Sequence, residues 1–226
     1  MGDLIEDPLL RDRTLVFSGR HDAGERLGKL LASLPAIRDP VVLAVPAGGV
    51  PVGRMIAGAL SAPLALAVAR KVRIPGTTES GFGAVTWDGS VLINERLREA
   101  LGLSEREVER AVRETRKNVR RRLETFARWR EFPPLGGKTA ILTDDGLASG
   151  FTMLAASRSL RRLGPARVVV AVPTASLAAA ELLRREVDLV VCLNVRTGRI
   201  FAVADAYREW HDLTDDEVIA ELAAVS

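Results

Sequence analysis

The stretch Lys138–Thr152 reads KTAILTDDGLASGFT, and the rest of the chain can be arranged around it. Residues 139–143 are apolar and β-branched, which is typical of a buried strand in a parallel sheet. Two carboxylates follow at once, Asp144 and Asp145, and then small residues lead into a helical pattern. The backbone N–H groups and helix dipole of such a loop attract an anion, and the carboxylates can accept hydrogen bonds from sugar hydroxyls. The stretch therefore predicts a site for a phosphorylated sugar.

The same stretch resembles the phosphoribosyl pyrophosphate (PRPP) signature of the type I phosphoribosyltransferases. In that family a hydrophobic strand runs into two acidic residues and a small-residue loop that ends in Gly-x-Thr. The resemblance implies that Asp144 and Asp145 hold the ribose hydroxyls of PRPP and reach a metal only indirectly, through PRPP. The loop that follows would bind substrate, with its turn at 149–152 on the 5-phosphate. Its residues are Gly146, Leu147, Ala148, Ser149, Gly150, Phe151 and Thr152. The alternative is an αβ unit whose acidic pair merely caps a helix.

A second loop follows the strand predicted over 41–45, and it contains Pro46, Ala47, Gly48 and Gly49. Adjacent glycines let the backbone approach a ligand closely. The resemblance places the pyrophosphate of PRPP at this loop. A bacterial subgroup of the family reads Pro-Arg-Gly-Gly-Val-Pro-Val here, so Ala47 stands where those relatives carry arginine and one phosphate-binding cation is missing. The alternative is a plain βα turn that needs glycine for tight packing.

A basic pair, Arg70 and Lys71, closes the strand predicted over 64–70. Doubly wound sheets bind ligands beyond the carboxyl ends of their strands. The resemblance implies that a basic residue at this position reaches the pyrophosphate. We therefore take Arg70, Lys71, Asp144 and Asp145 as the candidate catalytic residues. Two basic residues at a strand end can also be merely solvated, so this assignment depends on the neighbouring motifs.

Residues 74–130 are predicted to be an insertion that begins with a loop and a hairpin. Strands over 82–86 and 90–94 flank the turn signal Asp88-Gly89. The resemblance places a mobile lid over the reacting centre at this point, and Glu79 in the loop matches a glutamate common in the bacterial subgroup. A lid would exclude water from a centre that otherwise hydrolyses.

A long amphipathic helix is predicted over 104–130, and Ser104 and Glu107 form a capping box at its start. One interpretation of its basic outer face is a surface for RNA or another anionic partner. The other is a solvated face whose arginines pair with nearby glutamates. The second is favoured because the aromatic residues Phe126 and Trp129 are predicted to face inward. The basic residues are Arg106, Arg110, Arg113, Arg116, Lys117, Arg120, Arg121 and Arg122.

Strands and helices alternate along the chain, which predicts an α/β fold. The predicted architecture is a doubly wound parallel sheet of the type I phosphoribosyltransferase kind, with an inserted hairpin lid, a long helix and a small C-terminal hood. The resemblance covers about residues 12–222 and implies a five-stranded parallel core. No linker or repeat divides the chain, so residues 1–226 are expected to form a single phosphoribosyltransferase-like domain. The first helix is predicted from about Asp22, which would be its N-cap.

Three aromatic residues near the end of the chain, Phe201, Tyr207 and Trp210, are candidates for the hood. In type I phosphoribosyltransferases such a hood selects the nucleophile, and these rings could stack on a flat base. Aromatic residues in this position are more often part of the core.

Composition and charge exclude several classes of protein. The net charge of +3 argues against a molecule that binds polyanions over its whole surface. One cysteine, Cys192, cannot form an internal disulfide, which favours a reducing compartment. The first residues lack the basic start and apolar run of a signal peptide, and the longest apolar region, 168–183, is interrupted by Pro173. A cytoplasmic protein without a membrane segment is expected.

Together the motifs predict a phosphoribosyltransferase that moves a 5-phosphoribosyl group from magnesium-bound PRPP to a base or amine nitrogen and releases pyrophosphate. Mg²⁺ is the expected cofactor because the departing pyrophosphate needs a divalent cation. The expected partners are PRPP and an unidentified nucleophile, with a homodimer left open and nucleic acid only through the helix over 104–130. The alternative is a non-catalytic PRPP or nucleotide sensor that regulates RNA or a protein partner. Ala47 and the basic helix favour that alternative.

Overall fold

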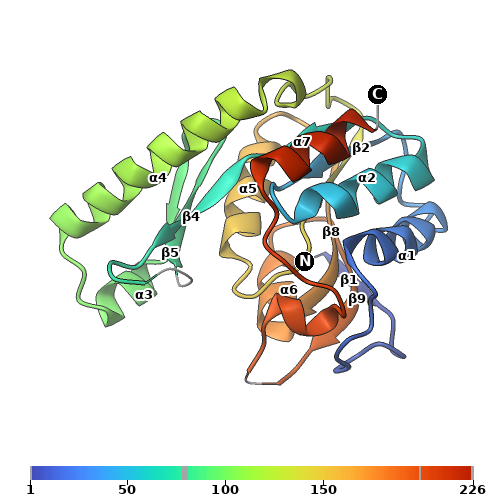
Figure 1. Ribbon diagram of the computed structural model, residues 1–226, viewed down its shortest axis with the longest axis horizontal. Helices are drawn as coiled ribbons and strands as arrows, with labels where there is room; N and C mark the ends of the chain where they lie inside the picture. Colours follow the sequence, from blue (N-terminus) through green and yellow to red (C-terminus); the bar gives the residue numbers. More distant parts are fainter. Residues whose placement is uncertain (1, 78–80, 199, 225–226) are drawn as a thin grey trace.

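A computed structural model describes residues 2–77, 81–198 and 200–224, and its central feature is a parallel sheet of six strands (Figure 1). The strand order is β1-β9-β8-β7-β2-β3, and each neighbouring pair is parallel. The predicted α/β fold is confirmed, with one more strand at the edge than the resemblance implied. The strands are β1 (Asp3–Glu6), β2 (Pro40–Ala44), β3 (Leu64–Leu66), β7 (Thr139–Thr143), β8 (Arg167–Ser176) and β9 (Leu189–Arg196).

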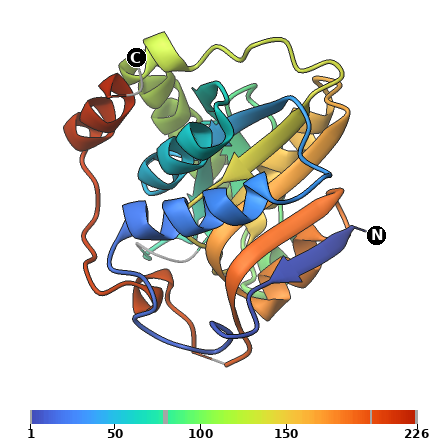
Figure 2. The same ribbon diagram turned by 90° about the vertical axis from the view of Figure 1, so that its right-hand side faces the viewer.

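Helices cover both faces of this sheet (Figures 1 and 2). Side chains alternate along each strand, so Val42 points to one face and Leu43 to the other. Val42 belongs to the cluster under α1 (Arg20–Ala32) and α2 (Gly49–Leu60). Leu43 belongs to the cluster under α5 (Phe151–Arg161) and α6 (Leu177–Leu183). The sheet is therefore doubly wound, and its central strands β2 and β7 are almost entirely buried because helices cover both faces.

A second, antiparallel sheet stands beside the first and is covered by the long helix (Figure 1). The prediction of one strand over 64–70 is wrong in its second half, because β3 ends at Leu66 and a new strand begins at Ala69. The new strand leaves the parallel sheet because its Val72 packs with Val119 and Phe126 of the long helix. The elements of this part are β4 (Ala69–Arg73), β5 (Gly81–Thr86), β6 (Val91–Ile93), α3 (Glu95–Ala100) and α4 (Glu105–Thr125).

The predicted hairpin is formed by β5 and β6, and its turn is tied to α5. Asp88 accepts hydrogen bonds from Thr86, 2.7 Å away, and from Arg162 of the segment after α5, 2.5 Å away. Burial acts to raise the pKa of Asp88, but these hydrogen bonds outweigh burial and lower the pKa to about 2. The turn is therefore anchored. Glu79, in the loop at the other end of the hairpin, lies outside the described residues.

The predicted capping box at Ser104 is present, and the sequence forms a second one at Thr214. Ser104 and Glu107 cap α4, and Thr214 and Glu217 cap α7 (Asp215–Ala223). Two short 3₁₀ turns, Ala127–Trp129 and Val203–Ala206, complete the elements. Among the described residues no helix is both long and apolar enough to cross a membrane.

Candidate functional site

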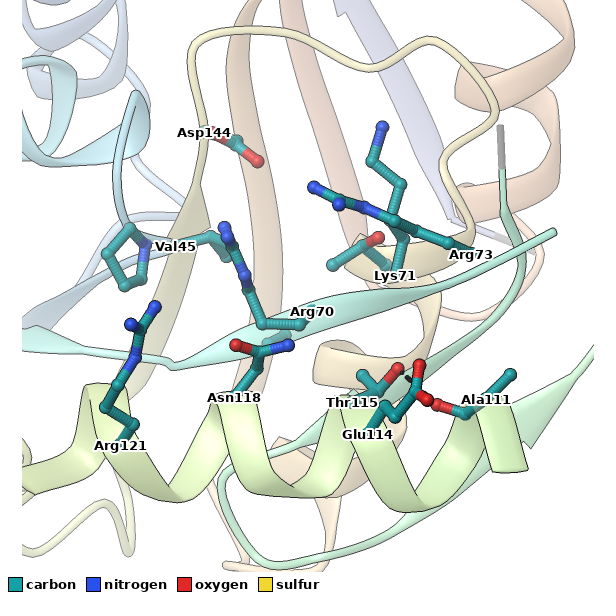
Figure 3. A pocket seen from close by; sticks show the side chains of 13 residues that line it. Val45, Arg70, Lys71, Arg73, Ala111, Glu114, Thr115, Asn118, Arg121 and Asp144 are labelled. Carbon is teal, nitrogen blue, oxygen red and sulfur yellow. Dashed lines mark hydrogen bonds between the residues drawn. The ribbon is translucent and has the colours of Figure 1, made fainter. Parts of the chain in front are cut away.

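Two adjoining cavities open where β2 and β7 end, beside β4, and Figure 3 shows the first of them. One has a volume of about 470 Å³ and is lined by basic residues of β4 together with α4; we call it the cationic cavity. The other, of about 530 Å³, is lined by the loop after β7; we call it the loop cavity. Lys71, Asp144 and Thr152 line both. These shared residues make the cavities two halves of one site.

The loop cavity is built by the connection between β7 and α5. All seven loop residues singled out in the sequence, Gly146 to Thr152, line it. Leu147 fixes the loop on β8, since its N–H donates to the carbonyl of Thr174 over 3.0 Å. Gly150 has φ +72°, a left-handed conformation that favours glycine, and α5 begins at the next residue. The first N–H groups of a helix have no partner in a preceding turn, so this arrangement can bind a phosphate.

Asp144 lies at the junction of the two cavities. Its Oδ1 accepts a hydrogen bond from the N–H of Asp145, 2.9 Å away. Burial raises the pKa of Asp144 well above its usual value, and the nearby charge of Asp145 raises it further. An ionised Asp144 is therefore unfavourable unless further hydrogen-bond donors reach it. Hydrogen-bond donors on a ligand, such as vicinal hydroxyls, would stabilise the charged form.

The cationic cavity gathers positive charge on the second sheet. Arg70, Lys71 and Arg73 of β4 line one wall, and Arg121 of α4 lines the other. Burial lowers the pKa of Arg70, and the charges of Arg122 and Arg73 lower it further. Several cations therefore lie close together with few carboxylates among them. Such a group of side chains is suited to an anion of high charge.

Comparison with known proteins bears on this arrangement. The family model of the phosphoribosyl transferase domain matches residues 29–206, which contain the loop, Asp144 and the basic strand. The chain belongs to this family. A Mycobacterium tuberculosis protein with the provisional name of a phosphoribosyl transferase is 37% identical over 207 residues, 92% of this chain and 46% of that protein. The chain thus spans about half the length of the curated relatives it matches.

This phosphoribosyl transferase domain also resembles solved structures. The crystal structure of TT1426 from Thermus thermophilus is 34% identical, has a TM-score of 0.75, and the match covers 94% of this chain and all of that one. The AQ2163 protein from Aquifex aeolicus is 13% identical with a TM-score of 0.50 over 83% of this chain and 78% of that chain. The second likeness concerns the fold alone.

Asp145, the other predicted ribose ligand of this phosphoribosyl transferase domain, has its side chain bound elsewhere. Its Oδ2 accepts a hydrogen bond from the Nε of Arg20, 2.9 Å away, and the two side chains are 14% and 8% exposed. Burial raises the pKa of Asp145, against the lowering effect of the Arg20 charge. Asp145 is not among the residues that line either cavity. The structure therefore brings Asp144 to the cavities and directs Asp145 to Arg20.

The C-terminal aromatic residues hold this ion pair in place. The guanidinium of Arg20 lies 3.9 Å from the centre of the Trp210 ring and donates to the carbonyl of His211 over 3.0 Å. Tyr207 packs between Phe17 and Trp210, and its hydroxyl donates to the carbonyl of Asp145. Tyr207 is only 2% exposed, so of its two interpretations the core position is confirmed and stacking on a base is wrong. Its ring is part of the core.

The glycine pair lies directly against the acidic pair. A Cβ atom on Gly48 would come within 1.7 Å of the Asp145 carboxylate, and one on Gly49 within 2.7 Å of the Thr143 carbonyl. The N–H of Gly49 already donates to the carbonyl of Val45. Close packing therefore explains both glycines, and their contact with pyrophosphate stays a prediction. Of the four residues proposed in this loop, Pro46 lines the cationic cavity, whereas Ala47, Gly48 and Gly49 are not among its lining residues.

Two basic residues of α4 depart from the prediction of a merely solvated outer face: Arg122 is buried, and Arg121 is exposed but lines a cavity. Arg122 is 6% exposed, and its Nη1 is 2.9 Å from the Oδ1 of Asp215 on α7. Arg121 lines the cationic cavity. The reason is that Arg121 and Arg122 stand next to the apolar stripe of α4. This stripe includes Val119 and Phe126 and packs on the second sheet, so both arginines are close to that sheet. Phe126 is buried as predicted.

Proposed function

We propose that the protein is a phosphoribosyltransferase that uses PRPP, transfers its 5-phosphoribosyl group to a nitrogen nucleophile and releases pyrophosphate. One observation carries this proposal: a loop suited to a monophosphate and a wall of cations suited to a diphosphate meet at Asp144. PRPP has the same order of groups, with its ribose hydroxyls between its two phosphate ends. The family membership supports the same chemistry.

In this proposal the N–H groups of Gly150 to Thr152 hold the 5-phosphate. Asp144 accepts hydrogen bonds from the ribose hydroxyls, and each such bond to a charged group is stronger than a neutral one. A nitrogen lone pair forms a bond to C1 while the C1–O bond breaks and its electrons leave with pyrophosphate. Arg70 and Lys71 meet the negative charge that grows on the leaving group.

Magnesium fits the residues of the site as an ion bound mainly through the substrate. Among the described residues no group of three His, Cys, Asp or Glu side chains is arranged to hold a metal ion. Asp144 and Glu114 are the carboxylates that line the cationic cavity. The phosphate oxygens of PRPP and water would therefore supply most ligands, with Asp144 nearby. When bound, the ion neutralises charge that develops on the pyrophosphate.

We further propose that residues 1–226 act as one phosphoribosyltransferase-like unit in which residues 74–130 are an insertion over the site. The position of α4 along the cationic cavity supports this. The burial of Cys192, which raises the pKa of its thiol, suits a protein of the cytoplasm that does not use thiol chemistry.

The first test of this function is calorimetric titration with magnesium PRPP and with ribose 5-phosphate, followed by a screen of bases and amines for pyrophosphate release. Ser149→Glu places a negative charge in the exposed loop proposed for the 5-phosphate. It should weaken binding of both ligands at least tenfold, while Ser149→Ala, the neutral control, should change it little. A wild-type protein that binds neither ligand would show that the function is assigned wrongly.

A separate experiment tests the regulatory alternative. The outer arginines of α4, for example Arg113, Arg116 and Arg120, are exposed, so a contact with RNA is sterically open to them. We expect only weak binding of RNA at physiological salt, with no preference for sequence, because no aromatic residue lies among these arginines. Filter binding with a random RNA pool, compared between the wild type and a variant with all three changed to Glu, measures this. A tight, sequence-selective complex that the variant loses would favour the regulator.

A further inference from the structure

Arg121 enters the site from an element that the sequence assigned to the surface. The residues of α4 that line the cationic cavity, Ala111, Glu114, Thr115, Asn118 and Arg121, recur every three or four positions and so form one stripe of the helix. Figure 3 shows Arg121 rising from α4 toward the side on which Arg70 stands. Pro46, the first residue of the glycine loop, lines the same cavity. The guanidinium of Arg121 therefore shares this cavity with the start of the glycine loop and with β4.

The excess of positive charge in this cavity favours the binding of an anion. Among the described residues that line it, four are basic: Arg70, Lys71, Arg73 and Arg121. Two are carboxylates, Asp144 and Glu114. Arg122 adds a further positive charge close to Arg70. Burial lowers the pKa of Arg70 most, and the charge of Arg122 lowers it further. A ligand with several negative charges would remove this repulsion.

The rotation of α4 that places the exposed Arg121 along the cavity is fixed in part by its neighbour in sequence. Arg122 is buried, pairs with Asp215 of α7 and lies with its guanidinium 5.1 Å from the centre of the Phe126 ring. Within the described part of the chain its Nε and Nη2 atoms have no hydrogen-bond partner. The ion pair with Asp215 of another helix and the packing of Val119 and Phe126 on the second sheet leave α4 little freedom to turn. Arg121 is consequently held toward the cavity.

We propose that Arg121 is a substrate-contacting residue whose guanidinium binds the pyrophosphate end of PRPP, supplying from α4 the cation that Ala47 does not supply from the glycine loop. This inference rests on the proposed function. Arginine suits the task because its planar donors bind phosphate oxygens in pairs. With this role for Arg121, a residue of α4 contacts the substrate.

The test compares Arg121→Met with Arg120→Met, which removes the same charge from the next, exposed position of α4, outside the cavity lining. Calorimetry measures binding of magnesium pyrophosphate, magnesium PRPP and ribose 5-phosphate to each variant. Arg121→Met should weaken pyrophosphate and PRPP binding about tenfold and leave ribose 5-phosphate unchanged. Arg121→Lys should recover part of the loss, because it keeps the charge without the paired donors. Arg120→Met should match the wild type.

Equal pyrophosphate affinity in Arg121→Met and Arg120→Met would overturn the role of Arg121, while PRPP binding by the wild type would leave the proposed function intact. A parallel loss of ribose 5-phosphate binding in Arg121→Met would also overturn it, because that result indicates a general disturbance of the site. If the wild type binds neither PRPP nor ribose 5-phosphate, the proposed function fails, and the inference fails with it.

Discussion

Arg20→Met is expected to lower the free energy of unfolding by about 3–5 kcal/mol, because it leaves the buried carboxylate of Asp145 without its partner. The two side chains are 8% and 14% exposed and 2.9 Å apart, so little water can replace the lost interaction. Methionine keeps much of the side-chain volume over Trp210. Urea denaturation followed by circular dichroism measures the change.

The double variant Arg20→Met/Asp145→Asn separates the charge from the packing. Because it removes both charges, it should be more stable than either single variant. Arg26→Met is the matched control, since Arg26 stands on the same helix and pairs with Asp22 over 2.8 Å at the surface. Its expected effect is below about 1 kcal/mol. A double variant no more stable than Arg20→Met would contradict the assignment of a buried ion pair.

Asp144→Asn is expected to act in opposite directions on binding and on stability. The amide cannot accept charge-assisted hydrogen bonds as strongly as a carboxylate, so affinity for magnesium PRPP should fall more than tenfold, or roughly 1.5–3 kcal/mol for each bond lost. The ligand-free protein should become more stable by about 1–2 kcal/mol, because a buried charge near Asp145 is removed. Calorimetry and urea denaturation measure the two effects.

The dependence on pH follows from the raised pKa of Asp144. A carboxyl whose folded-state pKa is raised stabilises the fold at low pH, and this contribution is lost as the pH rises through that pKa. The gain from Asp144→Asn should therefore be largest above the raised pKa and small in acid. Binding of PRPP to the wild type should weaken as the pH falls through the same range.

Asp145→Asn is the control for the effect of Asp144→Asn on stability, since it should destabilise the protein by leaving Arg20 unpaired. Equal stability changes in the two Asn variants would refute this difference between neighbouring residues.

The parts of the site that lie within one connection could be predicted from the sequence. Strand β7, Asp144, the loop and the start of α5 are contiguous, and their pattern of apolar, acidic and small residues is read directly. The capping boxes at Ser104 and Thr214 are equally local, because each joins residues three positions apart.

Contacts between distant residues escaped prediction. Arg20 lies 125 positions from Asp145, and no periodic pattern marks such a pair. The first helix was predicted from Asp22, whereas it begins at Arg20, so the residue that neutralises Asp145 was assigned to a loop. On α4, spacing alone identified an apolar stripe, but it did not show that Arg122 at its border is buried or that the exposed Arg121 lines a cavity. For the first helix, the available signal was Gly19 followed by Arg20, at the point where the helix begins. That signal was too weak to predict the ion pair with Asp145.

Strand β1 occupies the outer edge of the parallel sheet, where Asp3 to Glu6 pair with Leu189 to Cys192 of β9. It lies before residue 29, where the match to the family begins. A shortened chain that starts after Glu6 would leave the backbone N–H and C=O groups of an apolar strand open to other molecules. Exposed edges of this kind template strand addition between copies and lead to aggregation. By covering β9, and with a charged residue at each of its own ends, Asp3 and Glu6, β1 opposes the addition of a strand from another copy.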